Sequence, residues 1–376
     1  MALKSLIRQI EVIPIKIPLK REYKGSHYSM THRCTVITRV ITEDGIVGEI
    51  YNGDEHETQP AITDMILNRM APLVIGKNIF ATNEIWKTLW PFTFDILADR
   101  KIALNALACI DSAVYDAVGK TLNMPLYRLW GGAKDALPVM VIGGYYTEGK
   151  DVDEEAIRRD IETFKAMGAA GCKFKVGGRS PQVDAERVRI ARQVAGDDFV
   201  LAVDANQGWT RLEALQFSER VRDLNLRWFE EPCRWSVDRE AMRDVRMMSG
   251  IPVNAGQSEL SAAGCIGLMT AGAIDVCNFD ASWGGGPTAW RQVAAAAAAL
   301  GFEMAHHEEP QIAAHLLASA PTGTFLEVFH PDRDPLFYEI VENRNPFVNG
   351  YYKVPDGPGF GIRLNREVIE KYRVDR

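Results

Sequence analysis

The sequence lacks several features that mark whole classes of protein. Its six cysteines form no CxxC pair, which argues against a zinc cage and indicates a reducing compartment. No uncharged apolar run approaches the roughly 18–20 residues of a membrane-spanning helix, and Lys4, Arg8 and Glu11 interrupt the apolar core that a signal peptide needs. No basic block accompanies the net charge of −7, which argues against a nucleic-acid partner. We therefore expect a cytoplasmic protein that binds neither a membrane nor nucleic acid.

The periodicity of apolar residues divides the chain. Apolar and polar residues alternate up to about residue 50, with an Asp44-Gly45 turn, which is typical of antiparallel strands. The period then becomes helical up to about residue 130, most clearly over 102–122. We therefore predict that residues 1–133 form an α+β domain, and that a strand- and turn-rich tail, 336–376, rejoins it.

Residues 134–335 repeat a short apolar strand, a turn and an amphipathic helix. This alternation predicts a parallel barrel with helices outside. An open doubly wound sheet is the alternative, but GGYY and GGRS match neither G-x-G-x-x-G nor a P-loop. The eight predicted strands are 138–146, 171–177, 199–206, 227–232, 251–257, 274–280, 302–307 and 324–329.

Polar side chains end nearly every predicted barrel strand, where parallel strands form one mouth. Helix capping explains one such residue but not a series. In chain order they are Lys173 and Lys175, Asp204, Glu230, Gln257, Asp280, His307 and Glu327. The oxygens of Asp204, Glu230 and Gln257 would converge from adjacent strands, which suits a hard cation such as Mg²⁺; ordinary salt-bridged carboxylates are the alternative.

The lysines and a histidine are the candidate acids and bases. Lys173 and Lys175 share one strand face, and side by side they should depress each other's pKa. Asp280 would orient His307, although His306 is an equal rival because alternation lets only one of the two face inward. Glu327 could keep its proton or form a salt bridge.

These motifs resemble the enolase superfamily, and within it the mandelate racemase subgroup (the mandelate racemase/muconate lactonizing enzyme family). The matching segments are ACIDSAVYDAVGKTLNMPLYRLWGG, KFKVGG, DANQGW, WFEEP, FDASWGGG, the HH pair and VPDGPGFGI. The spacing from His307 to Glu327, 20 residues, also agrees and selects His307 over His306.

The resemblance implies a (β/α)7β modified TIM barrel under a capping domain built from both ends of the chain. It implies that Asp204 and Glu230 bind Mg²⁺, that Lys175 and His307 with Asp280 are opposing acid/base groups, and that Lys173 and Glu327 hold the substrate carboxylate. Where the family has AGE this chain has AGQSE, so Gln257 or Glu259 would be the third ligand.

The resemblance also implies removal of a proton α to a carboxylate, giving a metal-stabilised enediolate, and suggests a homo-oligomer. Racemases, cycloisomerases and dehydratases share this step. Polar loops near 21–33 and 51–59 favour a polyhydroxylated acid that could carry two carboxylates. We therefore expect an acid-sugar dehydratase making a 2-keto-3-deoxy acid; a racemase, epimerase or cycloisomerase, and a non-catalytic barrel scaffold, are the alternatives. The candidate substrate ligands are Asn206, Arg21, Tyr23, Lys24, His27 and His56.

Overall fold

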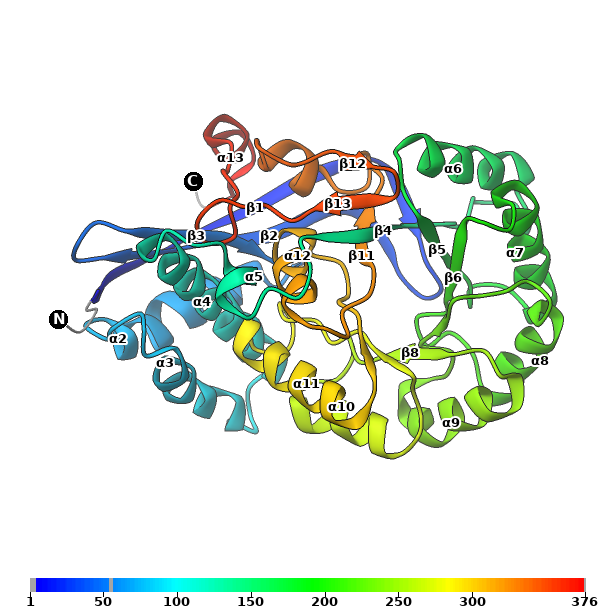
Figure 1. Ribbon diagram of the computed structural model, residues 1–376, viewed down its shortest axis with the longest axis horizontal. Helices are drawn as coiled ribbons and strands as arrows, with labels where there is room; N and C mark the ends of the chain where they lie inside the picture. Colours follow the sequence, from blue (N-terminus) through cyan, green and yellow to red (C-terminus); the bar gives the residue numbers. More distant parts are fainter. Residues whose placement is uncertain (1–4, 54–56, 375–376) are drawn as a thin grey trace.

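The computed structural model describes residues 5–53 and 57–374, which form a capping part and a barrel (Figure 1). In the capping part, β1 (Ile7–Lys24), β2 (Ser29–Thr42) and β3 (Val47–Asn52) form an antiparallel sheet in that order. The turn predicted at Asp44-Gly45 joins β2 to β3, with Gly45 at a φ of +86°. The long β1–β2 hairpin reaches the barrel, where the backbone N–H of Tyr146 donates to the carbonyl of Lys24.

Helices pack on this sheet, as the periodicity predicts. The longest, α4 (Arg100–Thr121), lies against β2 and β3. It is long and apolar enough to cross a bilayer, but 94% of its most apolar window is buried in the protein. The others are α1 (Gln59–Asp64), the π-helix η1 (Met65–Met70), α2 (Ala71–Val74), α3 (Thr82–Leu89), the 3₁₀-helix η2 (Trp90–Phe94) and α5 (Leu126–Leu129).

The barrel confirms all eight predicted strands in their predicted order. They are β4 (Ala136–Gly143), β5 (Gly171–Lys175), β6 (Val200–Asp204), β7 (Phe229–Glu230), β8 (Val253–Ala255), β9 (Val276–Cys277), β10 (Glu303–Met304) and β11 (Leu326–Phe329). Each pairs in parallel with the next as far as β10, and β11 pairs with β4. The N–H of Thr324, just before β11, donates to the carbonyl of Met304 at 2.8 Å and helps to close the ring.

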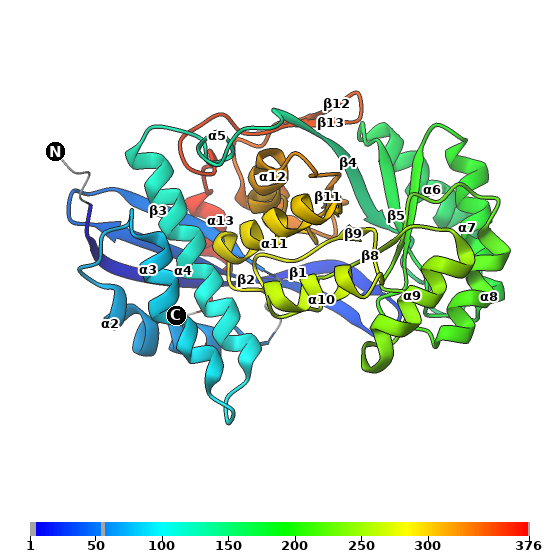
Figure 2. The ribbon, with the colours of Figure 1, turned by 60° about the horizontal axis from the view of Figure 1, so that its bottom comes forward.

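Seven helices connect these strands and surround them, which makes the fold a (β/α)7β barrel (Figure 2). They are α6 (Glu154–Ala166), α7 (Pro181–Ala195), α8 (Arg211–Val221), α9 (Asp238–Ser249), α10 (Ala262–Thr270), α11 (Pro287–Leu300) and α12 (Pro310–Ser319). A 3₁₀ turn, η3 (Trp235–Val237), precedes α9. The modified TIM barrel predicted from the motifs is therefore correct.

The C-terminal tail contacts both parts of the molecule. After the π-helix η4 (Leu336–Ile340), strands β12 (Phe347–Val348) and β13 (Tyr351–Lys353) form a hairpin, and β13 pairs with β4 of the barrel. Helix α13 (Arg366–Tyr372) packs against β1, and Arg366 forms an ion pair with Glu49 of β3 at 2.6 Å. The tail thus returns to the capping part through α13, while the domain boundaries after residues 133 and 335 stay predictions.

The loop after η2 carries the most exposed apolar side chains, Ile96 and Leu97, which are 88% and 93% exposed. Trp90, nearby, is stacked on Trp86 with ring centroids 4.5 Å apart. An exposed apolar tip is the kind of surface that a second subunit covers. The homo-oligomer remains a prediction.

A buried carboxylate joins the capping part to the barrel. Asp111 on α4 accepts hydrogen bonds from the N–H and hydroxyl groups of Thr288, both at 2.8 Å, and so caps the start of α11. The preceding Gly286 leaves room for it, because a Cβ there would lie 2.5 Å from an Asp111 oxygen. Burial raises the pKa of Asp111 to about 7.

This carboxylate should make stability depend on pH. Between the ordinary pKa of 3.8 and about 7, the folded protein holds a proton on Asp111 that the unfolded chain has lost, so the free energy of unfolding falls as pH rises through that window. Each pKa unit corresponds to about 1.4 kcal/mol. Urea unfolding at pH 5 and pH 7.5 gives the difference in the free energy of unfolding between the two pH values. We expect Asp111→Asn to make this difference smaller than in the wild type by about 1–3 kcal/mol. A difference equal to that of the wild type would contradict this account.

Candidate active site

The predicted polar residues of the first barrel strands come together at one end of the sheet. Lys175 on β5 is in register with Asp204 on β6, and Asp204 with Glu230 on β7. All three side chains are buried, as is Lys173. Both lysines therefore point into the barrel, as the apolar residues between them predict.

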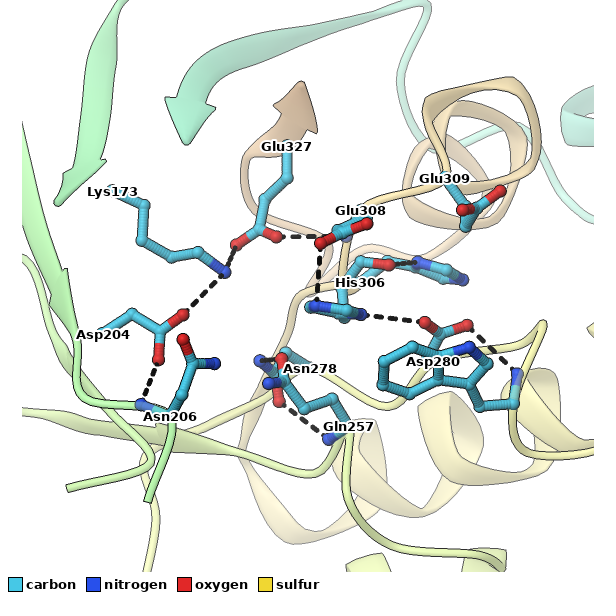
Figure 3. Close-up of polar contacts among 12 residues, drawn as sticks. Lys173, Asp204, Asn206, Gln257, Asn278, Asp280, His306, Glu308, Glu309 and Glu327 are labelled. Carbon is cyan, nitrogen blue, oxygen red and sulfur yellow. Dashed lines mark hydrogen bonds and ion pairs between the residues drawn. The ribbon is translucent and has the colours of Figure 1, made fainter. Parts of the chain in front are cut away.

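Lys173 lies at the centre of a group of carboxylates (Figure 3). Its Nζ is 2.6 Å from Glu230 Oε1, 2.6 Å from Glu327 Oε1 and 3.8 Å from Asp204 Oδ2. Burial alone would lower the pKa of Lys173, but the charges of Glu230 and Glu327 outweigh it and raise the pKa. Of the two possibilities for Glu327, the structure shows the salt bridge.

Lys175 is held by two oxygen atoms. Its Nζ donates to Asp204 Oδ2 at 2.7 Å and to Asn206 Oδ1 at 2.8 Å. Burial would lower the pKa of Lys175, but the charge of Asp204 outweighs it, and the pKa lies well above its ordinary value. The charge of Lys175 does lower the pKa of Lys173, as predicted, but the carboxylates that face Lys173 outweigh it. A neutral lysine beside a bound cation stays a prediction.

His307 and Asp280 form the predicted dyad. Asp280 Oδ2 lies 2.9 Å from His307 Nδ1, and the N–H of Ser282 donates to the other oxygen at 2.7 Å. The ring of Trp283 lies 4.9 Å from the imidazole, centroid to centroid. His306 points elsewhere, because its Nε2 accepts from the N–H of Ala281, which settles the choice between the two histidines.

Other histidines have structural surroundings. His315 lies between the N–H of Tyr127 and the carbonyl of Phe360, and burial lowers its pKa to about 4. His330 follows β11 and lines a separate small pocket. Neither reaches the mouth.

The fifth strand places Gln257 in the mouth and Glu259 outside it. Gln257 donates to Glu231 at 3.0 Å, and its amide oxygen accepts from Asn278 at 3.0 Å. Glu259 instead forms an ion pair with Arg239 of α9 at 2.7 Å. The prediction that Glu259 could bind the metal therefore has to be corrected, because its side chain is directed to the outer helices.

Glu231 and Asn254 are among the site residues that escaped the prediction from the sequence. Glu231 follows the strand residue Glu230, so alternation directs it outward, but its φ of +39° turns it back into the mouth, where Ser258 donates to it at 2.6 Å. Asn254 on β8 is fully buried and donates to Glu230 Oε2 at 2.8 Å. The EE pair in WFEEP was the only signal for Glu231.

The donor atoms around Glu230 suit a hard divalent cation. Burial raises the pKa of Glu230, and the charges of Asp204 and Glu327 add to this, so a cation would stabilise its ionised form. The buried Oδ1 of Asn254 has no hydrogen-bond partner in the described chain. Asp204 adds a carboxylate from the next strand. Among residues 5–53 and 57–374, no three Asp, Glu, His or Cys side chains are grouped so that they could hold a metal ion. The ammonium groups of Lys173 and Lys175 instead form ion pairs with Glu230 and Asp204.

A pocket of about 340 Å³ opens above these residues, lined by both parts of the molecule. Tyr28, Ser29 and Met30 of the β1–β2 hairpin face Lys175 and His307 across it. The other lining residues are Asn206, Gln207, Glu231, Gln257, Ser258, Trp283, Glu308 and Arg333.

Most of the predicted substrate ligands of the capping loops lie elsewhere. Arg21 and Tyr23 line the separate pocket beside His330. Lys24 forms ion pairs with Glu22 and Glu148, and His27 Nε2 lies 3.3 Å from the Gly208 carbonyl. These four predictions are therefore wrong about position, because Tyr28, Ser29 and Met30 of the hairpin line the pocket instead. His56 lies outside the described residues.

Two family models together cover most of the chain. Residues 8–131 match the mandelate racemase/muconate lactonizing enzyme N-terminal domain, and residues 156–368 match the enolase C-terminal domain-like family. The chain belongs to the mandelate racemase/muconate lactonizing enzyme family. The resemblance inferred from the motifs is thereby confirmed.

Members of this family with known names or structures are similar along the whole chain. Arabinonate dehydratase of Saccharolobus solfataricus is 28% identical over 90% of each chain. The 3,6-anhydro-alpha-L-galactonate cycloisomerase of Streptomyces coelicolor is 26% identical over 98% of this chain and 100% of the relative. A solved family member from a marine actinobacterium, in complex with magnesium, is 48% identical with a TM-score of 0.93, covering 99% of this chain and 100% of that one.

Proposed function

We propose that this protein is a Mg²⁺-dependent acid-sugar dehydratase. The observation that supports it best is a pocket lined by Lys175 and the His307–Asp280 dyad, over buried carboxylates that suit a cation. The similarity to arabinonate dehydratase supports the dehydration, and the solved relative in complex with magnesium supports the metal.

The site divides into a part that holds the substrate carboxylate and a part that moves protons. The charge of Lys173 would attract a carboxylate, and Glu327 would have to take up a proton before it could donate a hydrogen bond to one of that carboxylate's oxygens. Asp204, Glu230 and Gln257 would hold Mg²⁺, which would supply positive charge against the negative charge that develops on the substrate.

Lys175 then removes the proton α to the carboxylate. Because Asp204 keeps Lys175 protonated here, this role requires the carboxylate to be neutralised first. The charges of Glu308 and Asp280 raise the pKa of His307 well above its ordinary value despite burial, so His307 carries a proton. Protonated His307 can donate to a departing β-hydroxyl, and loss of water leaves a 2-keto-3-deoxy acid.

The same pair of groups supports a second candidate, an epimerase or cycloisomerase of a sugar acid. Two acid/base groups lining one pocket could remove a proton from one face and return it to the other. A non-catalytic scaffold has less support, because it gives no reason to bury Lys173, Lys175, Asp204 and Glu230 together.

A screen of acid sugars with Mg²⁺ distinguishes these candidates. A dehydratase gives a keto acid that reacts with semicarbazide. An epimerase in D₂O instead exchanges the α-proton and gives no keto product. A complete lack of turnover and exchange across the acid-sugar library would overturn the proposal.

The third metal ligand is tested by two variants of the same loop. We expect Gln257→Ala to weaken Mg²⁺ binding by about 10-fold or more, whereas Glu259→Gln should leave it unchanged because Glu259 is paired with Arg239. Isothermal titration of both variants with Mg²⁺ gives the comparison. Weaker binding in Glu259→Gln alone would contradict the assignment.

A further inference from the structure

A carboxylate that the proposed mechanism does not use projects into the site. Glu308 follows His307 and lines the pocket. Its Oε1 is 3.3 Å from His307 Nε2, the ring nitrogen opposite Asp280, and its Oε2 is 3.3 Å from Nη1 of Arg33 on β2. Glu308 thus connects the catalytic histidine to the capping part.

The backbone holds this side chain in place. Glu308 and Glu309 both have a φ of +50°, a left-handed conformation that residues with a Cβ rarely adopt. The N–H of Glu308 donates to Glu327 Oε2 at 3.1 Å, and Glu309 accepts from the N–H of Gly53 at 3.2 Å. Because hydrogen bonds hold both residues of this strained turn, the position of the Glu308 side chain is fixed.

Two of the cations at this end of the pocket, Arg33 and His307, face carboxylates, and Arg333 also lines the pocket. Buried Arg33 lies 3.3 Å from Glu308, 3.6 Å from Glu309 and 3.3 Å from Asp334. His307 lies between Asp280 and Glu308. Burial would raise the pKa of Glu308, but the charges of His307 and Arg33 hold it well below its ordinary value, so Glu308 is anionic.

The position of Glu308 corresponds to the tail of an acid sugar. The proposed carboxylate site is at Lys173 and Glu327, on β5 and β11. The side chain of Glu308 extends from there toward Arg33 on β2. Hydroxyl groups can donate to such a carboxylate, whereas a second carboxylate placed there would meet the like charge of Glu308.

We propose that Glu308 makes this enzyme selective for acid sugars with one carboxylate and a neutral hydroxylated tail, aldonates rather than aldarates. This inference rests on the proposed function. It narrows the substrate class, because the sequence alone allowed a doubly acidic substrate.

The test compares aldonates with the aldarates of the same configuration, which differ only at the far carbon. With Mg²⁺ present, we expect wild-type kcat/KM to favour the aldonate by about 100-fold or more. We expect Glu308→Gln to reduce this preference to about 10-fold or less, because an amide carries no charge. The preference is a ratio, so a general loss of activity in the variant does not affect it.

Glu219→Gln is the matched control, because Glu219 is an exposed carboxylate on the outer helix α8, paired with Arg222. It should keep the wild-type preference. The wild-type comparison needs no variant to fold, and wild-type turnover of aldarates as fast as aldonates would overturn the inference while leaving the dehydratase proposal intact. An unchanged preference in folded Glu308→Gln would overturn the role of Glu308. Failure of both acids in every pair would overturn the proposed function and this inference with it.

Discussion

Replacing Lys175 by Met should reduce acid-sugar dehydration by about 10²–10⁴-fold, the usual contribution of a general base. Met keeps the apolar length of the side chain but removes the nitrogen that contacts Asp204 and Asn206. Because Lys175 is assigned to the α-proton, exchange of that proton with D₂O should also disappear. Proton NMR of the substrate in D₂O measures both effects.

His307→Asn separates the two proton transfers. It should lose dehydration but keep α-proton exchange, since His307 is assigned to the departing hydroxyl. Lys165→Met on α6 is the control, because Lys165 lies outside the site against the ring of Phe199. Exchange at the wild-type rate in Lys175→Met would contradict the assignment of the base, and loss of exchange in both variants would contradict the separate roles of Lys175 and His307.

Asp204→Asn should abolish the stabilisation of the protein by Mg²⁺. A ligand present at 100 times its Kd stabilises a protein by about 2.7 kcal/mol, so wild-type Tm should rise by several degrees with saturating Mg²⁺. Without Mg²⁺ the variant should melt at a lower temperature than the wild type, because the buried ammonium groups of Lys173 and Lys175 lose a carboxylate partner. Breaking a buried ion pair costs about 3–5 kcal/mol of stability. Circular dichroism melts with and without Mg²⁺ measure both effects.

Asp223→Asn is the control for this experiment, since Asp223 is an exposed carboxylate paired with Arg189. It should melt like the wild type and keep the full response to Mg²⁺. An undiminished Mg²⁺ response in Asp204→Asn would place the cation elsewhere.

The barrel and the floor of its mouth could be predicted from the sequence because they depend on local periodicity. Apolar strands alternate with amphipathic helices, and alternation within β5 turns Lys173 and Lys175 inward together. The neighbours of each strand then follow from the parallel order, which brings Asp204 and Glu230 side by side. These features need no knowledge of distant contacts.

The remaining site features depend on geometry that alternation does not encode. Positive φ angles at Glu231 and Glu308 redirect two carboxylates that a regular strand or turn would place elsewhere. Glu259 was a candidate metal ligand because it follows Gln257 by two residues, but its ion pair with Arg239 of α9 depends on a helix whose contacts the strand pattern does not predict. The lysine pKa values depend on carboxylates from three other strands.

The capping loops were the least predictable part. Polarity alone selected Arg21 and Lys24, whereas Tyr28 and Met30 of the β1–β2 hairpin line the pocket over the mouth. The Nζ of Lys175 lies 5.7 Å from the Tyr28 ring centroid, so the hairpin reaches the proposed base directly.

A crystal structure of the protein with Mg²⁺ and a slowly reacting aldonate tests the central claim most directly. The account predicts the sugar carboxylate beside Lys173 and Glu327, its α-carbon between Lys175 Nζ and His307, and its hydroxylated tail against Glu308. An aldonate bound outside this mouth, or bound there with its α-carbon away from both Lys175 and His307, would contradict it.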